Sequence, residues 1–330
     1  GPTDQLPGRT APEFDASGHV VLPGFVDSHT HAVFARSRAD EFEWRIEGTP
    51  YMDILARGGG ILSSVHAVRA AESLHVQFAD RFLEYGTTTI EAKSGYGLDL
   101  QNEIRMLEAM RSEPVLEIVP TYLGAHALPL EYRGKRVEFI HQVIDDLTSI
   151  CDRGLAEFCD VFVEPGIFTV GEARQIFEKA RSLGMHIKVH ADEFESSGGA
   201  GLAVEMGATS ADHLGAIADG DIARIAASDV VATLLPATMF MLGSTRYAPA
   251  RKLIESGAAI ALATDFNPGT SPTLNMQFVL TLACTQMRMT PAETIVAATI
   301  NGACAVRRQE RLGSIEAGKQ ADIAVYDVTD

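Results

Sequence analysis

Eight short apolar runs of β type recur along the chain, and amphipathic stretches with a helical period lie between many of them. The runs span residues 20–26, 87–92, 116–122, 159–163, 186–189, 210–212, 230–234 and 258–263. The helical stretches span residues 64–84, 133–153, 170–183 and 248–256. Strands that alternate with helices predict an α/β fold with parallel strands. A closed (β/α)8 barrel and a doubly wound open sheet both satisfy this pattern.

The first run leads into two histidines, His29 and His31, two residues apart. Side chains at positions i and i+2 of a strand project from the same face, so both imidazoles can meet one metal ion. Two unrelated histidines are the alternative, and the pair alone does not decide between them.

Three further candidate ligands stand where later runs end. His190 closes one run, His213 closes the next, and Asp265 follows the last, almost wholly apolar run. Together with the pair His29 and His31, these residues come from the first, fifth, sixth and eighth runs. Only a closed ring brings the first and last strands together. We therefore predict the barrel, with the site at the carboxyl ends of its strands.

Composition and charge narrow the class of protein. The chain has 330 residues, of which 46% are hydrophobic, so it can bury a large core. Its net charge of −17 argues against binding nucleic acid and would repel an anionic substrate, which would need a local basic clamp. The sequence has neither an apolar stretch long enough for a bilayer nor a secretory leader pattern, so we expect no membrane association and a cytoplasmic protein.

The two chain ends depart from the barrel pattern. Residues 312–326 predict a turn followed by an alternating strand, which we expect to join the first residues in a small β domain. The predicted division is residues 1–20 and 309–330 for this domain and 21–308 for the barrel.

Several motifs resemble the metal-dependent amidohydrolase superfamily. They are residues 23–31, His190, His213, Asp265 and residues 316–322. Within that superfamily, residues 34–43, 51–56, 58–61, 91–98, 190–193 and 263–269 resemble the imidazolonepropionase family. The resemblance implies a barrel beside a β-sandwich, of which this chain supplies only part. It also implies a hydrolase of cyclic amides that converts 4-imidazolone-5-propanoate to N-formimino-L-glutamate in histidine degradation, and a homodimer.

The same resemblance assigns the metal ligands and the catalytic groups. The ligands are His29, His31, His190 and Asp265. Val163 and Glu164 end the fourth run without a lysine that could be carboxylated, so one ion is the simpler expectation, although Glu164 could bind a second. A His₃Asp set suits zinc or iron equally.

Three residues are expected to act in catalysis. By resemblance Glu193 passes a proton to the leaving nitrogen. His213 orients the substrate oxygen, and Asp265 either coordinates tightly or accepts a proton. Taken alone, Glu193 would read as a solvated helix-start residue and His213 as a core histidine.

The remaining assignments concern the substrate. Arg38 matches the position that binds the propionate, for which a bidentate guanidinium suits a carboxylate. The other residues that match substrate-contacting or pocket-wall positions are Tyr51, Tyr96, His126, Asn267, Gly269 and Thr270. Without the resemblance, Arg38 would be a solvated ion pair with Asp40 or Glu41, and the tyrosines would be packing residues.

Two other functions stay open. Purine or pyrimidine deaminases of this superfamily use a similar metal set, but a neutral base does not require Arg38. A catalytically inactive metal-binding scaffold would require neither Glu193 nor His213.

Overall fold

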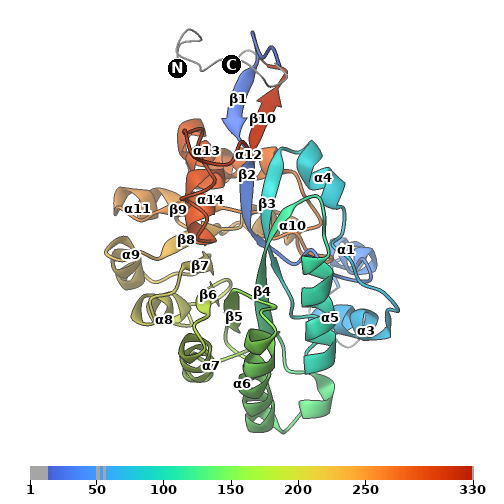
Figure 1. Ribbon diagram of the computed structural model, residues 1–330. Coiled ribbons are helices and arrows are strands. Elements are labelled where there is room, and N and C mark those ends of the chain that lie inside the picture. Colours follow the sequence, from blue (N-terminus) through green and yellow to red (C-terminus); the bar gives the residue numbers. More distant parts are fainter. Residues whose placement is uncertain (1–13, 50–52, 55–56, 329–330) are drawn as a thin grey trace.

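Eight parallel strands form one sheet in chain order, and helices surround them (Figure 1). The computed structural model describes residues 14–49, 53–54 and 57–328. The strands are β2 (Phe25–Thr30), β3 (Thr87–Lys93), β4 (Glu117–Ala125), β5 (Phe158–Val163), β6 (His186–Ala191), β7 (Ser210–His213), β8 (Val231–Leu234) and β9 (Ile260–Leu262). A parallel bridge between Thr30 and Phe266 links β2 to the segment after β9, so the sheet is a nearly closed barrel. The predicted (β/α)8 barrel is confirmed, and the open sheet is wrong.

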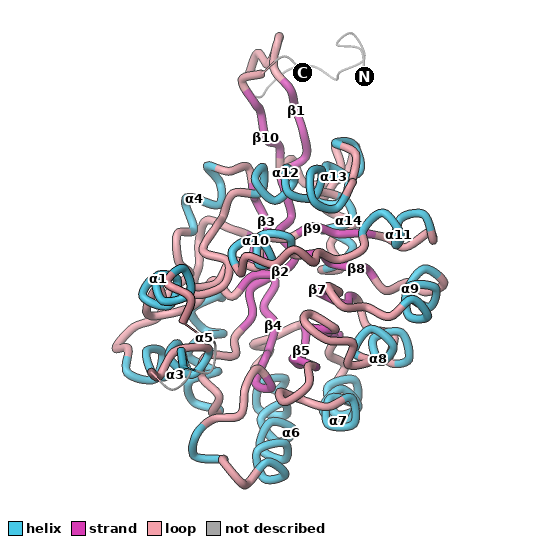
Figure 2. Tube along the Cα trace, turned by 180° about the vertical axis from the view of Figure 1, so that it is seen from behind, coloured by secondary structure: helices cyan, strands magenta, loops and turns pink. Residues whose placement is uncertain are grey.

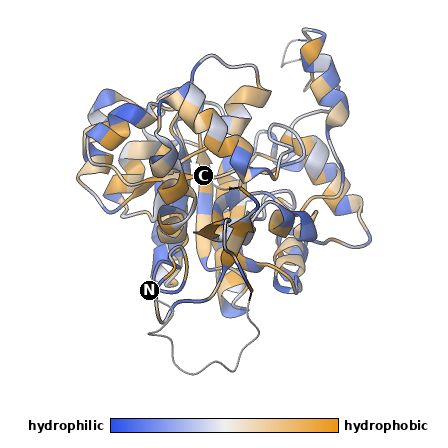
Figure 3. Ribbon diagram, turned by 90° about the horizontal axis from the view of Figure 1, so that it is seen from above, coloured by the Kyte–Doolittle hydropathy of each residue, from blue (hydrophilic) through white to orange (hydrophobic). Residues whose placement is uncertain are grey.

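Helices connect successive strands and form the outer ring, which is also visible from behind (Figure 2). They are α1 (Ala39–Ile46), α3 (Ile61–Ala70), α4 (Ala79–Glu84), α5 (Leu100–Arg111), the 3₁₀ helix η2 (Leu130–Tyr132), α6 (Arg136–Asp152), α7 (Val170–Ser182), α8 (Gly199–Glu205), α9 (Asp219–Ala226), α10 (Pro236–Met241), α11 (Ala250–Glu255), α12 (Met276–Met287), α13 (Pro291–Ala298) and α14 (Ile300–Ala305). Many of these helices carry both hydrophobic and hydrophilic segments (Figure 3), as expected for elements that pack on a barrel. Among the described residues, no helix is both long and apolar enough to cross a membrane.

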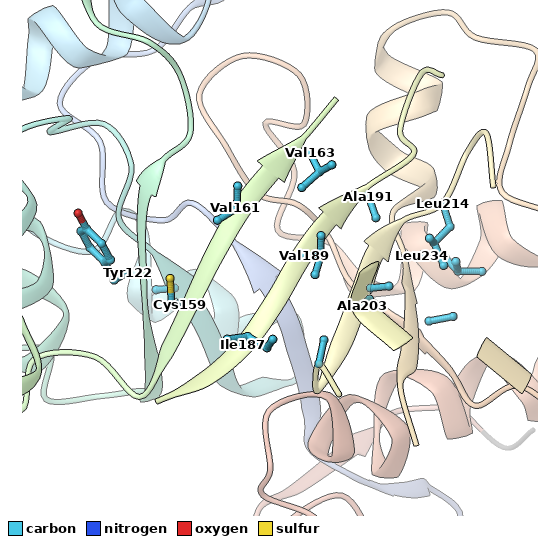
Figure 4. Close-up of a cluster of buried hydrophobic side chains, with 14 of the residues drawn as sticks. Tyr122, Cys159, Val161, Val163, Ile187, Val189, Ala191, Ala203, Leu214 and Leu234 are labelled. Carbon is cyan, nitrogen blue, oxygen red and sulfur yellow. The ribbon is translucent and has the colours of Figure 1, made fainter. Parts of the chain in front are cut away.

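Side-chain alternation along the strands separates the core from the site. Val161 and Val163 of β5 and Val189 and Ala191 of β6 lie in one apolar cluster (Figure 4). Alternate positions project from the opposite face of a strand, and on β5 and β6 they include polar residues such as Asp160, Lys188 and His190 that are also buried. The strands therefore pack apolar side chains against the helices and direct a polar set into the barrel.

The chain ends form a separate two-stranded antiparallel sheet, in which β1 (Val20–Pro23) pairs with β10 (Ile323–Tyr326). The two strands extend away from the barrel together (Figure 1). The single predicted strand over residues 20–26 is therefore wrong in extent, because the chain leaves this small sheet at Gly24 and enters the barrel at Phe25. A Cβ on Gly24 would lie 2.4 Å from Thr88 Oγ1, so any other residue there would require the Thr88 side chain of β3 to move.

The single predicted helix over residues 64–84 is also wrong. The structure has α3 and α4 there, separated by residues 71–78, which contact the segment after β2. Val76 forms an antiparallel bridge with Val33, and Gln77 N donates to Ala32 O at 2.8 Å. These tertiary contacts replace helical hydrogen bonds that the local pattern favoured.

Candidate active site

The predicted ligands meet at the carboxyl ends of the barrel strands. His29 lies in β2, His190 in β6 and His213 at the end of β7, while His31 and Asp265 follow β2 and β9. These residues form two groups, and within each group the ligand atoms all lie within 4.8 Å of one another. One group is His29, His190 and His213, and the other is His29, His31 and Asp265.

The donor atoms of this cluster fit a metal ion. The buried Nε2 atoms of His29 and His190 have no hydrogen-bond partner among the described residues. Asp265 Oδ1 lies 3.6 Å from His29 Nε2 and 3.5 Å from His31 Nε2. Burial, followed by neighbouring charged groups, lowers the pKa of His29 and of His31 well below the ordinary value, which favours the neutral imidazole that coordinates a metal.

Backbone strain also marks the cluster. His213 and Asp265 have φ values of 78° and 53°, a left-handed conformation that costs a residue other than glycine about 1–2 kcal/mol. Thr238 Oγ1 donates to Asp265 Oδ2 at 2.6 Å, which leaves Oδ1 directed toward the histidines. Burial raises the pKa of Asp265 to about 6, and a cation among these ligands would favour its ionised form.

Two carboxylates behind the imidazoles were missed by the sequence analysis. Asp212 Oδ2 lies 2.6 Å from His29 Nδ1, and Asp160 Oδ2 lies 2.7 Å from His190 Nδ1. A carboxylate on the rear nitrogen orients a ligand histidine and raises its basicity. The sequence carried one signal for them: each aspartate has an even residue number, and the even-numbered residues of these strands face the barrel interior.

A cavity of about 410 Å³ opens onto the cluster. Its lining includes the predicted residues Arg38, Tyr96, His126, Glu193, Asn267 and Thr270. Gly269 adjoins it, and Tyr51 lies outside the described residues. The cavity thus brings the described substrate-binding candidates to the same face of the barrel as the candidate ligands.

A basic rim lies on one wall of this cavity, along α1. Arg38 is 5% exposed, and its Nε lies 3.5 Å from Glu41 Oε1. Arg45, seven residues further along the chain from Arg38, also lines the cavity, and its Nη2 donates to Gly269 O at 3.1 Å. Two arginines against one glutamate leave a net positive charge there, although the chain as a whole is strongly acidic.

Gly269 allows this wall to form. A Cβ on Gly269 would lie 1.5 Å from Arg38 Nη2, so a side chain there would displace the guanidinium. Asn267 Oδ1 accepts hydrogen bonds from the backbone N–H of Gly269 and of Thr270, at 2.9 and 2.7 Å. The turn therefore brings bare backbone against Arg38.

Glu193 projects from the loop after β6. Its Oε1 lies 3.6 Å from His213 Nδ1, and the residue is 6% exposed. Burial, followed by the charges of Asp265 and Glu164, raises the pKa of Glu193 well above its ordinary value. A carboxyl group that keeps its proton near neutral pH can act as an acid.

Glu164 holds the loop that carries Glu193. Its carboxylate accepts the backbone N–H groups of Glu193, Phe194 and Glu195 at 3.1, 3.2 and 2.7 Å. These bonds tie the loop after β6 to the end of β5. The structure therefore indicates an anchoring role for Glu164, which the sequence analysis did not anticipate.

Tyr96 and His126 surround His31. The His126 ring stacks on His31 with a centroid separation of 5.0 Å, and Tyr96 lies 5.8 Å from His31. His126 Nδ1 lies 3.0 Å from Gly95 O, which leaves Nε2 for other partners. Burial lowers the pKa of His126 to about 3, so this side of the cavity is aromatic and neutral.

Comparison with known proteins agrees with this geometry. The model of the amidohydrolase family matches residues 20–330. An imidazolonepropionase of Alkaliphilus metalliredigens is 48% identical over 329 residues, which cover 97% of this chain and 78% of that protein. An imidazolonepropionase of Solibacter usitatus is 49% identical over 325 residues, 96% of this chain and 78% of that protein.

The chain belongs to the imidazolonepropionase family of amidohydrolases. Solved structures with a similar fold include a zinc-bound adenosine deaminase from Xanthomonas campestris, which is 18% identical with a TM-score of 0.62 and covers 94% of this chain and 72% of that one. A guanine deaminase from C. acetobutylicum is 14% identical with a TM-score of 0.64, covering 93% of this chain and 78% of that one. At these identities the likeness shows the shared amidohydrolase fold alone.

Proposed function

We propose that the protein hydrolyses the ring amide of 4-imidazolone-5-propanoate and releases N-formimino-L-glutamate. The observation that carries this proposal is the pairing of a His/Asp cluster with a buried arginine in one cavity, in a chain nearly half identical to imidazolonepropionases. The cavity thus combines candidate groups for amide hydrolysis with a cation for the propionate.

His29, His31, His190 and Asp265 would hold one ion, zinc or iron. When bound, such an ion lowers the pKa of a water and polarises a carbonyl. His213, the member of the cluster that is not assigned as a ligand, would orient the carbonyl oxygen of the ring. Water would add its oxygen to the carbonyl carbon and lose a proton, for which Asp265 is the candidate acceptor. The bond from that carbon to the ring nitrogen would break, and Glu193 would deliver the proton that this nitrogen needs.

The cavity walls would supply binding and orientation. Arg38 would bind the propionate, and Tyr96 and His126 would contact the ring or the tail. Asn267, Gly269 and Thr270 would shape the wall against which Arg38 lies, and Tyr51 keeps its role by resemblance. We also propose that the protein works as a cytoplasmic homodimer, which size-exclusion chromatography with light scattering and cell fractionation would test.

The decisive experiment is turnover of freshly generated imidazolonepropionate by purified protein, with and without a chelator. We expect formiminoglutamate to form, the chelator to abolish its formation, and added Zn²⁺ or Fe²⁺ to restore it. A parallel panel of purines and pyrimidines should show no deamination. Deamination of a base would replace the proposed function, and metal binding without any turnover would indicate a scaffold.

A further inference from the structure

A buried ammonium lies behind the metal-site candidates and outside the cavity lining. Lys93 ends β3 and is 0% exposed. Its Nζ lies 2.7 Å from Glu91 Oε1, 2.8 Å from Asp160 Oδ2 and 3.7 Å from Asp212 Oδ2. A lysine in this position cannot contact a substrate in the cavity, so its function must act through the carboxylates around it.

Two of these carboxylates hold candidate metal ligands. Asp160 Oδ1 accepts the backbone N–H of His190 at 3.1 Å, and Asp160 Oδ2 lies 2.7 Å from the Nδ1 atom of the same ring. Asp212 Oδ2 lies 2.6 Å from His29 Nδ1. In both residues a carboxylate oxygen lies beside the rear nitrogen of the ring, so Nε2 is the atom that would face the ion.

The carboxylates need a cation to stay in place. Glu91, Asp160 and Asp212 are all 0% exposed, and buried carboxylates are stable only when they are paired. Ligand histidines depend on such partners, whose loss typically weakens metal binding 10–100-fold. One ammonium faces both carboxylates, so it links the orientations of two ligands that lie 161 residues apart in sequence (190 − 29).

We propose that Lys93 is a positioning residue of the metal site, whose ammonium fixes the two carboxylates that orient two ligand imidazoles. This inference rests on the proposed metal site. The native chain is therefore titrated with Zn²⁺ first, because a chain that binds no zinc refutes the metal site itself rather than the role of Lys93.

The chain offers a matched control in Lys188. This ammonium is equally buried and lies 3.6 Å from Asp212 Oδ2. However, its Nζ donates to two backbone carbonyls, Ser28 O and Ala305 O, both at 3.2 Å. Lys188→Met thus removes a buried positive charge from the same interior without removing the group that holds Asp160.

The test uses the double variant Glu91→Gln/Lys93→Met, which removes one negative and one positive charge and so preserves the buried net charge. Zn²⁺ affinity is measured by competition with a chromophoric chelator, and the visible spectrum of the Co²⁺-loaded protein reports ligand geometry. We expect Zn²⁺ affinity to fall 10–100-fold and the Co²⁺ bands to change. We expect Glu91→Gln alone and Lys188→Met to stay within about threefold of the native affinity, well short of such a loss.

Two results overturn the inference. The first is a folded double variant that binds Zn²⁺ as tightly as the native chain with an unchanged Co²⁺ spectrum. The second is a loss in Lys188→Met as large as in the double variant, which would reduce the effect to buried charge. If the double variant does not fold, Asp160→Asn replaces it, since the amide removes the negative charge that pairs with Lys93 and keeps one oxygen that can accept from His190. Native Zn²⁺ affinity in Asp160→Asn would equally refute the proposal.

Discussion

The role of Glu193 as the proton donor can be tested by replacing it with glutamine. The side chain is 6% exposed and lies 3.6 Å from His213. Its backbone N–H is anchored by Glu164 Oε2 at 3.1 Å, so the isosteric Glu193→Gln should leave the loop in place. Burial raises the pKa of Glu193, which favours the protonated carboxyl. An amide of the same shape cannot release a proton, so the variant removes proton transfer and little else.

General acid catalysis contributes roughly 10²–10⁴-fold to a rate, which corresponds to about 3–5 kcal/mol of transition-state stabilisation. We expect kcat for imidazolonepropionate to fall by that factor, with KM changed less than about threefold because the binding contacts remain. Stopped reactions assayed for formiminoglutamate give kcat and KM, and metal analysis of the same samples should give the native metal content.

Glu195→Gln is the matched control. Glu195 lies two residues further along the same loop, its backbone N–H also binds Glu164, and its side chain is exposed. This variant should keep native kcat. If Glu193→Gln retains kcat within tenfold of the native value, the proton reaches the leaving nitrogen from another group and the assignment is wrong.

Three further predictions concern the cavity wall and the stability of the fold. Arg38→Met should lower kcat/KM for imidazolonepropionate at least tenfold, since a charge-assisted hydrogen bond contributes about 1.5–3 kcal/mol. For an imidazolone without the propionate, kcat/KM should be unchanged. Equal losses of kcat/KM for both substrates would refute the carboxylate contact. Gly269→Ala should raise KM while the thermal midpoint stays within about 2 °C, because its Cβ displaces the Arg38 guanidinium rather than backbone; native KM would contradict this. Burial raises the pKa of Asp146 from 3.8 to about 6. The folded protein therefore holds this proton more tightly than the unfolded chain does, and the ionised carboxylate destabilises the fold, with its full effect above pH 6. Asp146→Asn should therefore raise the midpoint of thermal unfolding at pH 8 by a few degrees, with the gain vanishing as the pH falls through 6 toward 4; a gain that is the same at both pH values would refute the assignment.

The barrel strands were predictable because parallel strands buried on both faces leave a local signal. The predicted runs 87–92, 159–163 and 210–212 correspond to β3, β5 and β7 within one residue at each end. The helix over residues 64–84 failed for the opposite reason, since contacts of Val76 and Gln77 with the segment after β2 override the local period.

Sequence alone determined the identity and topological address of the candidate ligands. His29, His31, His190, His213 and Asp265 each stand at or just after the end of an apolar run, and a parallel barrel places all such ends on one face. This inference needs only local pattern and strand order.

Only the tertiary structure decided which groups support those ligands. Asp212 lies against His29 although 183 residues separate them, and Lys93 faces aspartates on two other strands. Which inward side chains meet in a barrel depends on the register and curvature of every strand around the ring, and local sequence carries no record of that geometry.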